Sequence, residues 1–164
     1  MAALSREQAH VNGWLEELGS SINQKFHLDS QGVCTMDYKD ELRISVEVPH
    51  GSDQFYVYGP LVDLSSVENQ QQVLHKALSL NLFQLETAGG TLAIDELTSE
   101  IVFCFVSKVG NQGISIFQNI LNNFVSTADR LRGLLKDASQ PMAGGGNDKV
   151  ATPAQGKSQH FMQV

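Results

Sequence analysis

The chain has 164 residues, 41% of them hydrophobic and 18% charged, which is enough for one domain with a substantial core. Its net charge of −7 disfavours nucleic acid as a partner, because an acidic surface repels the phosphate backbone. No apolar run approaches the about 20 residues of a membrane helix, and the first residues lack a secretory signal pattern. We therefore expect a cytoplasmic protein without membrane insertion.

The first predicted element is a helix from about Ser5 to Leu18. Ser5 and Gln8 have the spacing of a capping box, which satisfies free amides of the first turn, and Gly19 can end the helix. Apolar residues recur at helical spacing along one face, namely Val11, Trp14, Leu15 and Leu18.

Three strands are predicted next, over residues 33–38, 41–48 and 54–61. The second alternates without interruption and places four apolar residues on one face, Leu42, Ile44, Val46 and Val48. Short turns rich in Pro, Gly and Asp separate the strands, so antiparallel neighbours are expected.

A second helix is predicted to start with a capping box of Ser65 and Glu68 and to end near Leu80. Gly89 and Gly90 then break the chain before two further strands, over residues 91–95 and 101–109. The last of these strands has no polar alternation, which predicts that both of its faces are covered.

The last predicted helix begins with a third capping box, Ser115 with Gln118, and carries the longest apolar stripe: Phe117, Ile120, Leu121, Phe124, Ala128, Leu131 and Leu135. After Ser139 the sequence has no period and contains three consecutive glycines. We expect residues 1–138 to form one α+β domain in the order helix, three strands, helix, two strands, helix, and residues 139–164 to form a disordered tail.

The sequence contains one formal match to a cofactor-binding motif, and its context does not predict a site. Residues 151–158 satisfy a permissive phosphate-loop pattern, but no strand precedes them and only six residues follow. The histidines have no zinc-site spacing, no carboxylates are paired for acid–base work, and Cys34 and Cys104 are expected as reduced, buried thiols. We therefore predict no catalytic residue, no metal, no cofactor and no enzymatic activity.

Several stretches resemble a known family. Residues 77–84 (ALSLNLFQ), then residues 89–95 (GGTLAID), and residues 55–59 (FYVYG) before them, are similar to the class I type III secretion chaperones, the Tir chaperone (CesT/SycE-like) family. The resemblance covers about residues 5 to 137 by element order, and the tail is an extension to that pattern.

This resemblance implies a homodimer joined through the second helix and an adjacent strand. The candidate interface residues share the broad apolar face of that helix: Val73, Leu74, Ala77 and Leu78. From the pattern alone, the same face is equally compatible with the core of a single chain.

The resemblance also implies a bacterial cytoplasmic chaperone that binds the N-terminal segment of effector proteins. It would keep that segment non-globular and soluble and deliver it to the export apparatus, whose ATPase would remove the client. Candidate client contacts lie on the first helix and on two strands, with core packing as the alternative for each strand residue: Leu15, Leu18, Ile44, Val46, Phe55 and Val57. Two other functional readings remain open, a dimeric adaptor or scaffold for folded partners and a small-ligand or enzyme domain.

Overall fold

The computed structural model describes residues 4–38, 42–110 and 112–140. Within them it has three α-helices, two short 3₁₀ turns (η1 and η2) and five strands. In chain order these are α1 (Arg6–Ser21), β1 (Val33–Tyr38), β2 (Leu42–Glu47), β3 (Gln54–Asp63), η1 (Leu64–Ser66), α2 (Gln70–Leu80), η2 (Leu82–Gln84), β4 (Thr91–Asp95), β5 (Glu100–Lys108) and α3 (Ile114–Ser139). The predicted order of elements is confirmed. The prediction of a disordered tail over residues 139–164 is not tested, because residues 141–164 lie outside the described part of the chain.

The strands form one antiparallel sheet in the order β1-β2-β3-β5-β4. This confirms the predicted α+β class. Val46 of β2 lies opposite Val57 of β3, which in turn lies opposite Phe105 of β5, so one face of the sheet is apolar across its centre. Strands β1 and β4 are the two edges.

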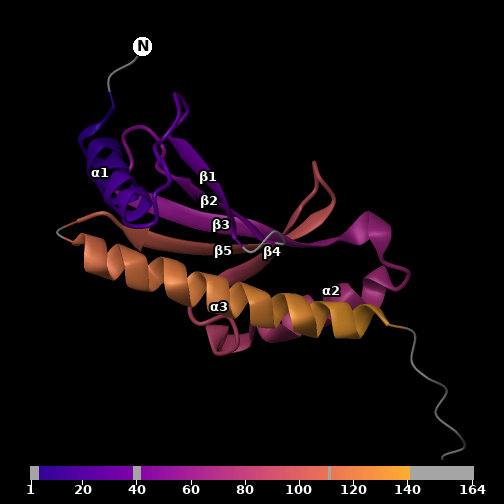
Figure 1. The fold of residues 1–164 in the computed structure, drawn as a ribbon. Coiled ribbons are helices and arrows are strands. Elements are labelled where there is room, and N and C mark those ends of the chain that lie inside the picture. The colour runs from indigo at the N-terminus through magenta and orange to yellow at the C-terminus, as the bar shows by residue number, and fades with distance from the viewer. Residues whose placement is uncertain (1–3, 39–41, 111, 141–164) are drawn as a thin grey trace, which may run out of the picture.

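The helices α1 and α3 cover that apolar face. Trp14 of α1 contacts both Phe55 of β3 and Phe117 of α3, with ring centroids 6.3 Å and 5.4 Å apart. Further along α3, Phe124 stacks on Phe103 of β5 at 4.8 Å. Figure 1 shows α3 running along the length of the sheet, with α1 near the N-terminal end of α3.

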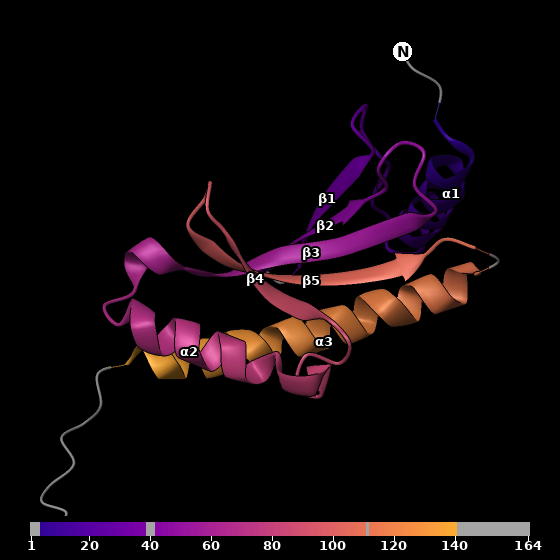
Figure 2. The same cartoon turned by 180° about the vertical axis from the view of Figure 1, so that it is seen from behind.

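Helix α2 packs beside the C-terminal half of α3, on the same side of the sheet (Figure 2). Its buried residues are Val73, Ala77 and Leu80. Because these occupy one face of the helix, the opposite face is left for solvent or a partner.

Only the first of the three predicted capping boxes forms. Ser5 Oγ accepts a hydrogen bond from the Gln8 backbone N–H at 3.2 Å, and Gln8 Oε1 accepts one from the Ser5 N–H at 2.9 Å. The prediction for Ser65 is wrong, because Asp63 accepts the Ser65 N–H at 2.8 Å and a 3₁₀ turn forms there. Helix α2 therefore begins later, capped by Asn69.

The prediction for Ser115 is wrong as well. The residue before α3 is Gly113, which has no side chain to cap the helix, and Ser115 lies inside the first turn. Helix α1 also extends past Gly19 to Ser21.

The prediction that both faces of β5 are covered is wrong for its outer face. Val102 and Cys104 are only partly buried there, and Val106 is 45% exposed. The reason is that the helices pack on the face bearing Ile101 and Phe103, so the other face is open in the single chain.

Candidate functional site

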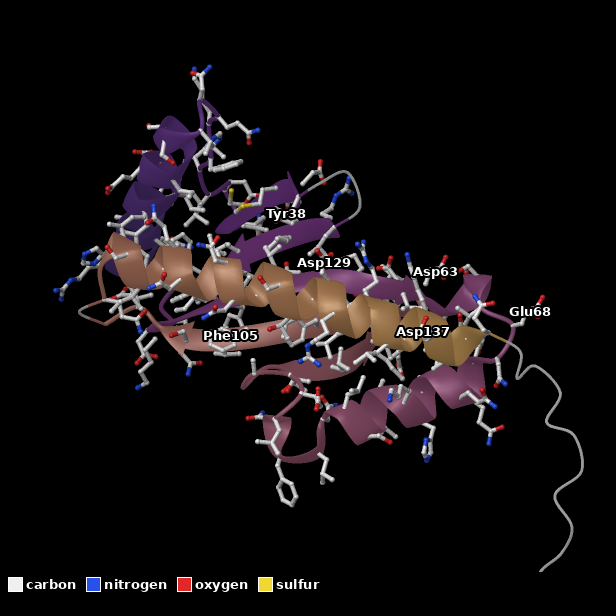
Figure 3. All side chains as sticks on the ribbon, turned by 60° about the horizontal axis from the view of Figure 1, so that its bottom comes forward. Tyr38, Asp63, Glu68, Phe105, Asp129 and Asp137 are labelled. Atoms are coloured by element: carbon white, nitrogen blue, oxygen red, sulfur yellow. The ribbon has the colours of Figure 1, made fainter. Side chains whose placement is uncertain are left out.

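A groove of about 420 Å³ opens between α1, β1 and α3. We call it the α1–β1 groove. Figure 3 shows Tyr38, at the end of β1, beside the middle of α3. The apolar lining is Leu18, Ile22, Phe26, Met36, Ile44, Leu121 and Val125, and polar side chains such as Gln24, Asp37 and Asn122 complete the walls.

Gly19 is the residue that allows one wall of this groove to form. The N–H groups of Ile22 and Gln24 both donate to the Gly19 carbonyl, at 3.1 Å and 2.8 Å, so the chain folds back over the end of α1. A Cβ atom on Gly19 would lie 2.7 Å from the Gln24 carbonyl oxygen and 3.1 Å from the Phe26 nitrogen. Only glycine permits this close approach, which brings Gln24 and Phe26 to the groove.

The returning segment is fixed at its far end by α1 as well. The Leu28 backbone N–H donates to Asn12 Oδ1 at 2.8 Å, and the Leu28 side chain is buried. The groove wall is therefore held at both ends by α1. Ile22, whose N–H makes one of these bonds at the end of α1, keeps 55% of its surface exposed.

The six predicted client contacts divide into two groups. Leu15, Val46, Phe55 and Val57 are fully buried, so in this chain they form core and offer no surface to a ligand. Leu18 and Ile44 line the α1–β1 groove, Leu18 as a partly buried residue and Ile44 as a buried one. The predicted client contacts did not include Ile22, Phe26 or Met36. Ile22 and Phe26 lie between the predicted elements and have no periodic neighbours, whereas Met36 lies in the short first strand.

A second apolar surface lies between α2 and β4, where a shallow groove of about 300 Å³ is almost wholly apolar. Three of the four predicted interface residues, Leu74, Ala77 and Leu78, line it, whereas Val73 is fully buried in the core. Leu78 is 72% exposed, and Ile94 on edge strand β4 is 51% exposed. We call this surface the α2–β4 patch.

Asn81 holds α2 against β4. Its side chain donates to the Leu92 carbonyl at 2.9 Å and accepts from the Leu92 N–H at 2.8 Å. One amide thus pairs with β4 as a neighbouring strand would, and fixes the relative position of the two walls of the α2–β4 patch.

Exposed apolar side chains continue in the turn that follows α2. Leu82, Phe83 and Leu85 are 63%, 81% and 79% exposed, and Figure 3 shows side chains of this turn projecting away from α3. Phe83 has a φ of 56°, a left-handed conformation that a bulky side chain rarely adopts. An aromatic ring held outward at such a position is typical of a contact surface.

A third hollow, of about 410 Å³, lies between α3 and β5 beside Phe105, which is labelled in Figure 3. The turn before β4 forms one side of it. Arg130 of α3 donates to the Glu86 carboxylate at 2.5 Å and also to the Glu86 backbone carbonyl, which fixes this turn against α3. The hydroxyl of buried Thr87 donates to the Gly90 carbonyl at 2.7 Å. The turn on this side of the hollow is therefore held in place by hydrogen bonds.

The described residues contain no cluster of His, Cys, Asp or Glu that could hold a metal ion. Cys34 is buried and Cys104 partly buried, and burial raises the pKa of both thiols. Burial, together with the nearby Glu47 carboxylate, also raises the pKa of Tyr58. The phosphate-loop match at residues 151–158 lies outside the described residues, and within them no helix is both long and apolar enough to cross a membrane.

Three helices on one face of a five-stranded antiparallel sheet, with open apolar surfaces at both edges, define the class of small α+β proteins to which the type III secretion chaperones belong. The family model described as Tir chaperone protein (CesT) matches residues 13–132, and the chain belongs to this family. The resemblance noted in the sequence is thereby confirmed.

Solved structures show the same fold. A chain of the ExsC-ExsE complex matches with a TM-score of 0.70 at 17% identity, covering 84% of this chain and 98% of that one. A chain of the HopA1-SchA chaperone-effector complex matches with a TM-score of 0.62 at 16% identity, covering 80% and 99%. A chain of the ExoU-SpcU complex from the type III secretion system of Pseudomonas aeruginosa matches with a TM-score of 0.55 at 17% identity, covering 77% and 98%. A search of curated proteins finds no match.

Proposed function

We propose that this protein is an effector chaperone of a bacterial type III secretion system, and that the α1–β1 groove binds the N-terminal segment of its client. The observation that carries the proposal is an open, apolar groove beside an edge strand in a member of the Tir chaperone protein family. Similar folds occur in complexes named for a chaperone and its effector.

The geometry suits an extended, non-globular client. Side chains of the client would enter the groove over Ile22 and Met36, while its backbone pairs with β1, the sheet edge on the same side. Burial of apolar surface contributes about 25 cal/mol per Å², so a segment that fills the groove is held without ATP. Keeping that segment covered prevents its aggregation before export.

The α2–β4 patch would join two copies of the chain. A twofold axis places the same patch of each copy against the other, so exposed Leu78 and Ile94 would be covered mutually. Phe83, exposed in the turn that follows α2, would add an aromatic anchor to the interface.

The remaining steps follow from this role. The chaperone would act in the bacterial cytosol, would not be an enzyme, and would present its client to the secretion ATPase, which removes it. Family membership does not favour the alternative of an adaptor for folded partners.

The test is client capture from the native bacterium by tagged variants. Ile22→Glu places a charge in the groove at a residue that is 55% exposed, whereas Ile116→Glu makes the same change at a 49% exposed residue of α3 outside the groove. We expect the first variant to lose the client and the second to retain it, with both keeping the parent's melting temperature within a few degrees. If the two variants capture the client equally well, the assignment of the client site to the α1–β1 groove is wrong.

A further inference from the structure

The sequence beyond α3 gathers three of its five large apolar side chains at residues 161–164. Residues 141–164 contain three glycines in a row and ten polar residues, with Phe161, Met162 and Val164 close together near position 164. Phe161 is the one aromatic side chain among these 24 residues, and Lys157 and His160 precede it. A short apolar segment on a polar, glycine-containing chain is typical of a tethered ligand.

The α1–β1 groove lies within reach of that segment. The groove uses Leu121 and Val125 in the first half of α3, and the helix ends at Ser139. At 1.5 Å per residue, Leu121 lies about 27 Å along the helix from Ser139. A glycine-containing chain leading from Gln140 to Phe161 has a root-mean-square span of about 25 Å.

Matching of span and distance has an energetic consequence. A tether whose mean length equals the separation of its two ends gives an effective concentration in the millimolar range. The two parts of the chain also attract each other, because residues 139–164 carry a net charge of +1 and the rest of the chain carries −8.

We propose that Phe161 and Met162 of the chain's own C-terminal segment dock in the α1–β1 groove and compete with the client. This inference rests on the proposed function, since it assigns a second occupant to the same site. Docking covers Ile22 and its apolar neighbours while no client is present. An arriving client displaces the segment, and its apparent affinity is reduced by the fraction of time the groove is occupied.

The size of the competition follows from the tether. With an effective concentration of about 1 mM, a segment whose free peptide binds at about 100 µM occupies the groove roughly nine-tenths of the time. A competing ligand then binds roughly tenfold more weakly than it does to a chain without the segment.

The experiment uses a fluorescein-labelled synthetic peptide of residues 155–164, titrated by anisotropy against the full chain and its variants. We expect the double variant Phe161→Ser, Met162→Ser to bind the peptide about tenfold more tightly than the parent. The control Val150→Ser, an apolar residue of the same segment away from its end, should behave as the parent. Adding Ile22→Glu to the double variant should remove binding.

Equal affinity of the parent and the double variant overturns the proposal, as does peptide binding that survives Ile22→Glu or fails to occur below 1 mM. None of these results bears on client capture, which depends on the groove without this peptide. Loss of the proposed function would instead appear as capture that Ile22→Glu leaves unchanged.

Discussion

Replacing Gly19 by alanine tests how the sequence builds the α1–β1 groove. The added Cβ would lie 2.7 Å from the Gln24 carbonyl oxygen and 3.1 Å from the Phe26 nitrogen, and both atoms belong to backbone that cannot rotate away. Overpacking of this kind costs about 1–3 kcal/mol. The intrinsic helix preference of alanine over glycine offsets up to about 1 kcal/mol of that cost.

Gly13 in the same helix provides the matched control. A Cβ there meets no atom within 4 Å, so Gly13→Ala keeps only the helix preference and should stabilise the protein by about 0.5–1 kcal/mol. The difference between the two variants therefore isolates the contact with the returning segment, about 1–3 kcal/mol.

Urea denaturation followed by Trp14 fluorescence measures both free energies, and thermal melts should show the same order, at about 2–4 °C per kcal/mol. Trp14 lies in α1 and is buried, so its emission reports loss of the packing around that helix. If Gly19→Ala stabilises the protein as much as Gly13→Ala does, the segment does not cross α1 as described.

Three further predictions address the core, the dimer and the pH dependence. Phe55→Ala removes a fully buried ring and should lower the free energy of unfolding, measured by urea denaturation, by about 3–5 kcal/mol. The groove variant Ile22→Glu should not show such a loss. Leu78→Glu should convert the dimer into a monomer of 17.9 kDa, measured by light scattering, while the control Ile116→Glu stays dimeric. A parent protein that is already monomeric contradicts the proposal that the α2–β4 patch joins two copies. Because burial raises the pKa of Cys34 and Tyr58, the folded state favours their protonated forms. The stability that comes from the protonated Cys34 thiol is complete below the unfolded thiol pKa of about 8.5 and is lost as the pH rises above it. The urea midpoint of unfolding should therefore fall between about pH 7.5 and 9.5 under reducing conditions. It should fall less in the variant Cys34→Ala.

The strands and helices were predictable because their patterns are long and their period is clear. The alternation from Leu42 to Val48 correctly gives one buried face over β2 and the residue that follows it, since each of the four apolar residues of this stretch is at most 2% exposed. The apolar stripe of α3 likewise correctly places Phe117, Leu131 and Leu135 in the core.

Local start signals were less reliable, because several backbone amides compete for one cap. Ser65 and Glu68 have the right spacing for a capping box, yet Asp63 takes the Ser65 N–H first and the helix begins only at Gln70. A spacing rule cannot rank these two partners without the path of the preceding strand.

The groove was predicted only in part, for a related reason. Ile22 and Phe26 lie in the groove with Met36 of β1 because Gly19 lets the chain return over α1, and no periodicity marks Ile22 or Phe26. Conversely, Val46, Phe55 and Val57 were placed at a client site because alternation reveals which face is apolar but not what covers it. In this chain α1 and α3 cover that face.

Hydrogen exchange of the captured complex tests the central claim most directly. With a client bound, the backbone amides of residues 22–26 and 36–38 should exchange more slowly than in the free chaperone. On the client, protection should be confined to a segment near its N-terminus, which otherwise exchanges as an unfolded chain. If the protected amides lie elsewhere on the chaperone, or if the client binds through a folded domain, the account of an effector chaperone working through the α1–β1 groove is contradicted.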